Sequence, residues 1–324
     1  MRLYGKTDVG QRRKNNQDSF VIRNYTDTGA ALGLVCDGMG GASGGNIASA
    51  LACETFIGRL DAFLSSDKVK DGTATEGDIT ATLAHAVSDA NAAVYRRAEK
   101  EPGLKGMGTT LVAALVVGNV LYAVNVGDSR MYMYAHGRLT QVTKDHSLVQ
   151  YLLDTGKLTA EEAKNYPSRN VITRAVGTER SIEADIFSLD LSVIADDPDA
   201  CALLCSDGLS GYVEASVISD IMQRIAPQDG DAAAEALVGA ANSAGGADNI
   251  TVVLMMPGRE TPDLIAAAAK AAEGTNPGEN GSKGSKESNG SIESMGSMGS
   301  IGSDEDVTTA ESADARKEPA DGNL

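Results

Sequence analysis

Residues 109–135 read TTLVAALVVGNVLYAVNVGDSRMYMYA, and they carry the clearest evidence for the fold class. It contains three apolar runs, 109–117, 120–126 and 130–135, separated by the pairs Gly118-Asn119 and Gly127-Asp128. β-Branched and aromatic residues favour strands, and turns this short join antiparallel neighbours. Because the runs are apolar on both faces, we predict a sheet that packs against a second sheet as well as against helices.

The patterns on either side of this stretch predict more strands and two pairs of helices. We expect strands at 19–23, 31–36, 139–142, 182–189, 201–205 and 249–255, and helices at 46–64, 78–100, 214–225 and 231–244. Short helices and loop fill 145–173, where Thr159-Ala-Glu-Glu162 fits a capping box. This order is not a simple βαβ alternation. It predicts an α+β fold, a four-layer α-β-β-α sandwich of two mainly antiparallel sheets flanked by helix pairs.

The composition changes after Pro257. Residues 258–324 contain more acidic than basic residues, and serine recurs at every third position from 282 to 303. We therefore expect a catalytic domain at 1–257 and an acidic Gly/Ser-rich flexible tail at 258–324, with one short alanine-rich helix at 263–272.

Charge and cysteine usage narrow the class of protein. The net charge of −17 argues against nucleic acid as a partner, because such binding relies on Lys and Arg. The four cysteines form no C-x-x-C pair and the three histidines are scattered, so zinc-type spacing is absent. We expect reduced, buried thiols. No signal peptide and no run of about 20 apolar residues is evident, so we expect a soluble cytoplasmic protein without a membrane partner.

Three aspartates follow or precede strand-like runs, at the points where each run meets a turn. These are Asp37, Asp207 and Asp248. Strand ends in a sandwich can converge on one edge, yet two carboxylates about 4 Å apart repel by about 4 kcal/mol at an effective dielectric of 20. Such a group would protonate or bind a cation, and an all-oxygen set selects Mg²⁺, Mn²⁺ or Ca²⁺ over zinc. We expect Gly38 to allow a tight turn, with its carbonyl available as a further ligand.

A single Asp-Gly pair is first of all a turn signal, but the order of the motifs along this chain is more specific. The chain resembles the PPM family of metal-dependent protein phosphatases, protein phosphatase type 2C. The matching pieces are Thr7-Asp8-Val9-Gly10, Arg13 with Asn16-Gln17-Asp18, Val35-Cys36-Asp37-Gly38-Met39-Gly40-Gly41, Gly106-Met107-Gly108-Thr109-Thr110, Gly127-Asp128-Ser129-Arg130, Asp145-His146-Ser147, Ser206-Asp207-Gly208-Leu209 and Asp248-Asn249-Ile250-Thr251.

The resemblance implies a metal centre built from these residues. Asp37 would bridge two tightly bound Mn²⁺ or Mg²⁺ ions, with the Gly38 carbonyl on one of them. Asp207 and Asp248 would complete the other ion, and Asp18 would lie at or just outside the ligand shell. Asp37, Asp207 and Asp248 would thus form the catalytic set.

The resemblance also implies a third, weaker ion and a reaction. Asp128 would hold that ion together with Asp207, and Arg13 would bind the substrate phosphate with its planar fork of donors. The reaction would be hydrolysis of phosphoserine or phosphothreonine in proteins, through a metal-bridged water that attacks phosphorus in line. A Ser/Thr kinase and its targets are the expected substrates, and a monomer is expected.

Two positions depart from other relatives of this family. Gln17 stands where others have Glu, and Met39 stands where many eukaryotic members have a histidine. The acid that protonates the leaving group is therefore left open between a metal-bound water and His146. Met39 and the compact core resemble bacterial members.

Single motifs of this chain also suggest other functions, and the sequence disfavours each of them. Cys53 and Arg59 match the C-x₅-R of cysteine phosphatases, but they lie in a helical pattern rather than a glycine-rich anion loop. The glycines of 38–44 imitate a dinucleotide-binding turn, which Asp37 at its mouth disfavours. An inactive relative that only binds would be expected to lack a metal aspartate, and none is lost. A two-metal nuclease is disfavoured by the net charge and by Arg13 as the lone nearby cation.

Overall fold

The structure is a computed structural model that describes residues 1–164, 166–226 and 228–258. The helix expected at 263–272 and almost all of the expected tail lie outside these residues.

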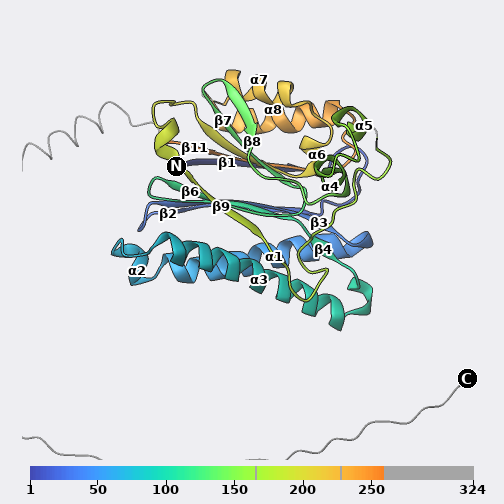
Figure 1. The fold of residues 1–324 in the computed structure, drawn as a ribbon, viewed down its shortest axis with the longest axis horizontal. Helices are drawn as coiled ribbons and strands as arrows, with labels where there is room; N and C mark the ends of the chain where they lie inside the picture. Colours follow the sequence, from blue (N-terminus) through green and yellow to red (C-terminus); the bar gives the residue numbers. More distant parts are fainter. Residues whose placement is uncertain (165, 227, 259–324) are drawn as a thin grey trace, which may run out of the picture. The chain divides into compact units, whose positions relative to one another are not determined.

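Two antiparallel sheets lie face to face in the middle of the described part (Figure 1). The first has the strand order β1 (Arg2–Asp8), β11 (Ile250–Met256), β10 (Cys201–Cys205), β7 (Arg130–Ala135) and β8 (Arg138–Gln141). The second has the order β2 (Asp18–Tyr25), β3 (Ala30–Met39), β5 (Leu111–Val117), β6 (Val120–Val126) and β9 (Asp185–Asp190), and the short β4 (Gly108–Thr109) pairs with the end of β3.

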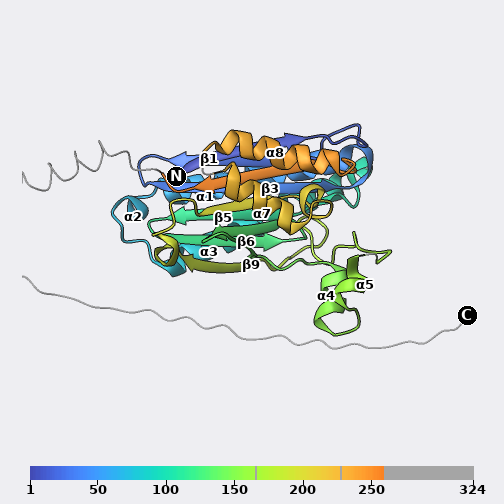
Figure 2. The ribbon, with the colours of Figure 1, turned by 90° about the horizontal axis from the view of Figure 1, so that it is seen from above.

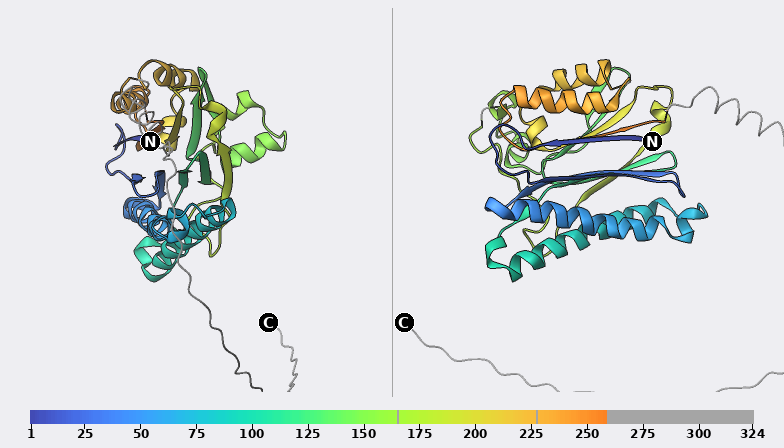
Figure 3. Two further views of the ribbon diagram at one scale, coloured as in Figure 1. Left: turned by 90° about the vertical axis from the view of Figure 1, so that its left-hand side faces the viewer. Right: turned by 180° about the vertical axis from the view of Figure 1, so that it is seen from behind.

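Helices cover the outer face of each sheet (Figure 3). The second sheet is covered by α1 (Gly41–Leu64) and α3 (Glu76–Lys100), with the short α2 (Asp67–Lys70) between them. The first sheet is covered by α7 (Ala215–Arg224) and α8 (Gly230–Ser243), next to the short α6 (Asp207–Ser210). The predicted four-layer sandwich is therefore confirmed.

Three apolar layers explain why the strands are apolar on both faces. In β10, Leu203 packs toward α7 and α8, whereas its neighbour Leu204 packs between the two sheets. In β3, Leu34 packs toward α1 and α3, whereas Val35 packs between the sheets. Successive side chains of a strand point to opposite faces, so each central strand serves two layers of core.

The sequence patterns locate most elements to within a few residues. The predicted strands 120–126, 130–135 and 201–205 coincide with β6, β7 and β10. The capping box is present before α5 (Ala160–Lys164), where Thr159 N donates to Glu162 Oε2 at 2.9 Å and Glu162 N donates to Thr159 Oγ1 at 3.3 Å. The predicted run 109–117 is divided, because Thr110 separates β4 from β5.

Strand β1 was not predicted. Its residues are all half-buried and include polar side chains, so the apolar signal is weak. It forms because its backbone pairs with β11 over its whole length, from Arg2 opposite Met256 to Asp8 opposite Ile250.

The segment between β8 and β9 carries α4 (Leu148–Asp154) and α5, and Figure 2 shows both helices at the side of the sandwich. Two loop residues of this segment, Asn170 and Ile172, reach the pocket described below. Among the described helices, none is long and apolar enough to cross a membrane.

Candidate functional site

A pocket of about 560 Å³ lies where the ends of both sheets meet. Its walls combine residues from loops that are far apart in sequence, and these include six of the predicted site residues: Arg13, Asp37, Gly38, Asp128, Asp207 and Asp248. The predicted convergence of the aspartates at one edge is thus seen in the structure.

The seventh predicted residue, Asp18, lies behind the pocket wall. It is the first residue of β2 and stands directly opposite Asp37 of β3. Its side chain is buried, and Oδ2 accepts hydrogen bonds from Ser206 Oγ at 2.8 Å and from Thr251 Oγ1 at 2.7 Å. Because Thr251 belongs to β11 of the other sheet and Ser206 directly follows β10 of that sheet, Asp18 joins the two sheets directly beneath the pocket.

Asp37 lies within β3 rather than at its end, because β3 continues to Met39. Its backbone is fixed by the neighbouring chain: Asp37 N donates to Thr110 Oγ1 at 2.9 Å, and Asp37 O accepts from Thr110 N and Thr109 Oγ1, each at 2.8 Å. The carboxylate is therefore presented by a rigid strand, which favours a well-positioned ligand.

Gly38 has a different role from the predicted one. It is part of the extended strand, so it makes no turn, and a Cβ there would lie 2.0 Å from the Gly45 carbonyl oxygen and 2.6 Å from that of Gln17. Glycine is required because α1 begins so close to β3. The chain turns later, at Gly40 and Gly41, which both have positive φ.

The pKa values of the carboxyl groups show how closely they are crowded. Burial, together with repulsion from Asp18, Asp207, Asp128 and Asp248, raises the pKa of Asp37 well above its usual range. Burial, with repulsion from Asp248, raises the pKa of Asp207 to about 6.

The pKa values of Asp18 and Asp128 are raised as well. Burial raises the pKa of Asp18 to about 7, although the hydrogen bonds from Thr251 and Ser206 act in the opposite direction. Burial and the nearby Asp207 raise the pKa of Asp128 to about 7. Without a cation, this group therefore holds protons at pH values where isolated carboxylates are charged.

The donors present fit divalent cations with a preference for oxygen. Asp18 Oδ1 and Asp207 Oδ1 are buried and have no hydrogen-bond partner, and an unsatisfied buried carboxylate oxygen is costly. Among the described residues, no three acidic, histidine or cysteine side chains already form a compact ligand set. The carboxylates are close enough to repel one another, and a bound cation would offset that repulsion.

Arg13 is already paired with one of the carboxylates. Its Nη2 donates to Asp248 Oδ2 at 2.7 Å, and half of the Arg13 side-chain surface is exposed. Lys14 also lines the pocket, so the expectation that Arg13 is the lone nearby cation was wrong. Two cations at the mouth give the pocket the means to attract an anionic substrate.

Asn249 is a site residue that the sequence reasoning missed. It is buried, its Nδ2 donates to the carbonyl oxygens of Val9 at 2.9 Å and Asn15 at 3.0 Å, and its Oδ1 accepts from Gln17 N at 2.8 Å. These bonds fasten the loop that carries Arg13 to the residue after Asp248. A polar residue directly after a candidate ligand and before a mostly apolar strand was the available signal.

His146 does not reach the pocket. Its ring is about one-tenth exposed, Nδ1 accepts from Gly127 N at 3.0 Å, and Nε2 lies 3.2 Å from Asp185 Oδ2. His146 is therefore absent from the pocket lining, whereas Met39 is part of it.

Two rival interpretations are excluded by the fold. Cys53 is buried in the middle of α1, and Arg59 Nε donates to Asp89 Oδ2 at 2.7 Å, so neither residue builds an anion loop. Strand β3 lies between two antiparallel neighbours, which differs from the parallel sheet of a dinucleotide-binding fold. All four cysteines are free and buried, as predicted.

Comparison with known proteins gives a consistent result. The family model described as Protein phosphatase 2C matches residues 9–240. The chain is 37% identical over 252 residues to the serine/threonine phosphatase stp of Listeria welshimeri, which covers 77% of this chain and 93% of the relative. It is 39% identical over 254 residues to the serine/threonine protein phosphatase PstP of Mycobacterium tuberculosis, covering 78% of this chain and 44% of the relative.

Solved structures share the fold. The catalytic domain of the phosphatase PstP, solved in complex with two manganese ions, superposes with a TM-score of 0.64 at 37% identity. The match covers 78% of this chain and 96% of that one.

Proposed function

The chain belongs to the protein phosphatase 2C family of serine/threonine protein phosphatases, and we propose that the pocket around Asp37, Asp207 and Asp248 is its active site. As a member of this family, it hydrolyses phosphoserine and phosphothreonine in proteins with the help of metal ions. One observation carries the proposal for the site: carboxylates from β2, β3, the start of α6 and the loop before β11 crowd together, and two of them have buried oxygens without partners.

The residues that would hold the ions follow from this arrangement. Asp37 is central, because the other carboxylates all raise its pKa, so it is the candidate to bridge two ions, with the Gly38 carbonyl as a neighbouring ligand. Asp207 and Asp248 would complete the set, and Asp18 would support it from behind. Asp128, which lines the same pocket as Asp207, would contribute with it to a third, weaker ion.

Mn²⁺ or Mg²⁺ is the expected cofactor, because the donors are all oxygen and because the related PstP was solved with manganese. When bound, such ions supply a water of lowered pKa as the nucleophile and neutralise the charge on the phosphoryl oxygens.

The protein's own cations would position the substrate. Arg13 is held near the carboxylates by its ion pair with Asp248. When Asp248 binds a cation instead, the guanidinium would be free to bind phosphate. Lys14 adds a second positive charge at the rim. No histidine lines the described pocket, so we propose that water, rather than a side chain, protonates the leaving group.

The finer assignments are inferences from the family and from the composition. We infer that phosphorylated proteins, among them a Ser/Thr kinase and its targets, are the substrates, and that the enzyme acts as a monomer. We place it in the cytoplasm, since four unpaired cysteines suit a reducing compartment. We also propose that residues 1–257 form the catalytic domain and that 258–324 are a flexible acidic tail.

Hydrolysis of phosphothreonine peptides tests the proposed site. The wild-type protein should be active with added Mn²⁺ or Mg²⁺ and inactive in EDTA. Asp207→Asn should be inactive in all three conditions while it keeps the thermal stability of a folded protein. Full activity of Asp207→Asn, or of the wild type in EDTA, would show that the catalytic centre lies elsewhere. Cleavage of nucleic acid but not of phosphopeptides would favour the nuclease alternative.

A further inference from the structure

The turn that presents Asp128 is held from several sides. It connects β6 to β7 and consists of Gly127, Asp128 and Ser129. Gly127 has a φ of 108°, and a Cβ there would lie 2.6 Å from Thr110 Cγ2. On the same side, Ser129 Oγ is hydrogen-bonded to Thr110 Oγ1 at 2.7 Å. The turn is therefore packed tightly against Thr110, between β4 and β5, which leaves its opposite side for a second support.

His146 supplies that second support through two hydrogen bonds to one residue. His146 N donates to Gly127 O at 2.9 Å, and Gly127 N donates to His146 Nδ1 at 3.0 Å. Both polar backbone groups of Gly127 are thereby bound to His146. A backbone held at two points, directly before Asp128, has little freedom to rotate.

The residue before His146 holds the other end of the same turn. Asp145 accepts from Arg130 Nε at 2.9 Å and from Arg130 Nη2 at 2.7 Å, which is a bidentate pair. Asp145 and His146 thus bind the residues on either side of Asp128-Ser129. The pair Asp145-His146 acts as a clamp on this turn.

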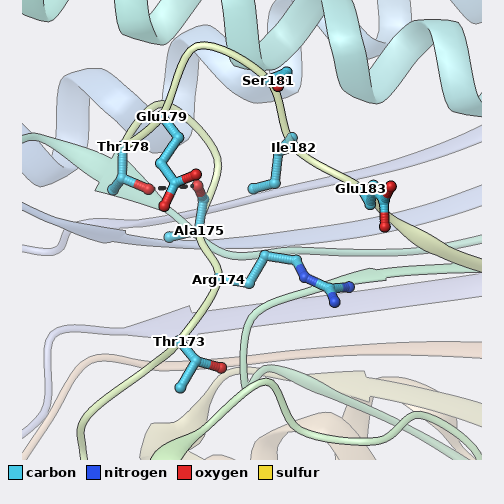
Figure 4. A pocket seen from close by; sticks show the side chains of 8 residues that line it. All are labelled: Thr173, Arg174, Ala175, Thr178, Glu179, Ser181, Ile182 and Glu183. Carbon is cyan, nitrogen blue, oxygen red and sulfur yellow. Dashed lines mark hydrogen bonds between the residues drawn. The ribbon is translucent and has the colours of Figure 1, made fainter.

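The hydrogen-bond pattern of the imidazole fixes its protonation state. Because Nδ1 accepts from Gly127, the hydrogen of the neutral ring is on Nε2, which lies 3.2 Å from Asp185 Oδ2 and 3.1 Å from Arg174 Nη1. With its hydrogen in place, Nε2 can donate to Asp185 but cannot accept from Arg174. Arg174 Nη1 donates to Asp185 Oδ1 at 2.8 Å. Arg174 also lines a second pocket, of about 470 Å³ (Figure 4), so the clamp connects the Asp128 turn to the loop around that pocket.

We propose that His146 is a positioning residue for Asp128: it fixes the Gly127–Asp128 backbone so that Asp128 keeps its place in the pocket lining, which it shares with Asp207. This inference rests on the proposed role of Asp128 as a ligand of a third ion. His146 itself touches neither substrate nor pocket, and its effect is exerted through the hydrogen bond from Gly127 N to Nδ1.

Two variants with the same functional group separate this bond from general packing. In His146→Asn, the amide oxygen takes the place of Nδ1 and can still accept from Gly127 N. In His146→Gln, the amide lies one carbon further out, near the former Nε2, and the bond to Gly127 is lost. Rescue by Asn but not by Gln is expected only if the Nδ1 position matters.

The first readout uses the metal-free protein. Nuclear magnetic resonance of the ring nitrogens should show His146 with its hydrogen on Nε2. Hydrogen exchange of the Gly127 amide should be slow in the wild type and in His146→Asn, and roughly three- to ten-fold faster in His146→Gln, as expected for the loss of one neutral hydrogen bond. Equally slow exchange in His146→Gln would overturn the proposal.

The second readout is a double-mutant cycle at limiting Mn²⁺. His146→Gln should lower the turnover of phosphopeptides roughly three- to ten-fold, but should cause no further loss in an Asp128→Ala background. An equal loss in both backgrounds would show that His146 does not act through Asp128. Normal turnover in Asp128→Ala alone would instead refute the proposed role of Asp128, which distinguishes the two failures.

Discussion

Arg13 Nη2 lies 2.7 Å from Asp248 Oδ2, so the predicted phosphate-binding arginine and a predicted metal-binding carboxylate form an ion pair. The pair keeps the guanidinium at the pocket mouth, where the negative charges of Asp37 and Asp207 also attract it. A cation bound to Asp248 would free Arg13 to bind phosphate, and phosphate bound to Arg13 would free Asp248 to bind a cation. The two binding events should therefore favour each other.

Arg13→Ala should mainly weaken substrate binding. Loss of a charge-assisted hydrogen bond of about 1.5–3 kcal/mol implies roughly ten- to hundred-fold lower kcat/KM. KM should rise more than kcat falls, because the guanidinium contacts phosphate in the ground state as well as the transition state. Steady-state kinetics on a phosphothreonine peptide measure this. Arg12→Ala is the matched control, since Arg12 is exposed and outside the pocket lining, and equal effects of the two would contradict the assignment.

The metal-free protein should lose stability as pH rises. The raised pKa values of Asp18, Asp128 and Asp207 mean that the folded state binds more protons than the unfolded state between about pH 4 and pH 7. These groups therefore stabilise the fold below pH 4 and lose that contribution as pH rises through 7. Thermal unfolding in EDTA should show a smaller decrease from pH 5 to pH 8 in Asp18→Asn than in the wild type.

Added Mn²⁺ should reverse this trend, because it binds the deprotonated carboxylates and raises the melting temperature more at pH 8 than at pH 5. Two results together would mean that the carboxylates do not form one site. The melting temperature would fall equally with pH in Asp18→Asn and the wild type, and Mn²⁺ would not change it.

Thiol alkylation should leave activity intact. All four cysteines are buried, and burial raises the pKa of Cys201 and Cys205 to about 12, so neither is a reactive thiolate. The measurement is turnover after treatment of the folded enzyme with iodoacetamide, with mass spectrometry to count modified thiols. Loss of activity that tracks modification of Cys53 alone would revive the cysteine mechanism.

Removal of the predicted tail should leave the chemistry unchanged. A variant ending at Gly258 keeps β11 and the hydrogen bond from Arg2 Nε to Pro257 O at 3.2 Å, so the sandwich stays complete. Its kcat on a small phosphoester should equal that of the full chain. A folded but inactive truncation would require a contribution of the tail to the site.

The sequence predicted the sandwich because the decisive signals are local. Strands such as β6 and β10 are short, apolar on both faces and bounded by turn residues. Strand β1 escaped prediction because its stability comes from pairing with β11, about 250 residues away in the chain, which no local pattern encodes. Asp207 and Asp248 could be found because they lie just outside β10 and β11, and Asp37 because it lies near the end of β3. The order of the motifs carried the family resemblance.

The supporting contacts could not be predicted in the same way. Asp18 joins the sheets through Ser206 and Thr251, and Asn249 fastens the loop that carries Arg13, yet each of these bonds joins distant segments. The sequence pointed to Gly38 as a site residue, but not to the reason why glycine is needed there. That reason is the close approach of Gly45, which depends on how α1 packs on β3. Local sequence therefore identifies candidate ligands, while tertiary packing decides how they are held.

Asp37 should bridge two tightly bound ions whereas Asp128 should serve a weaker one. Calorimetric titration of Mn²⁺ into Asp37→Asn and Asp128→Ala separates these two roles. Asp37→Asn should lose both tight binding events and all turnover of phosphopeptides. Asp128→Ala should keep both tight events, remain folded and lose much of its turnover. Equal loss of tight Mn²⁺ binding in the two variants, or tight binding of two ions by Asp37→Asn, would contradict the account.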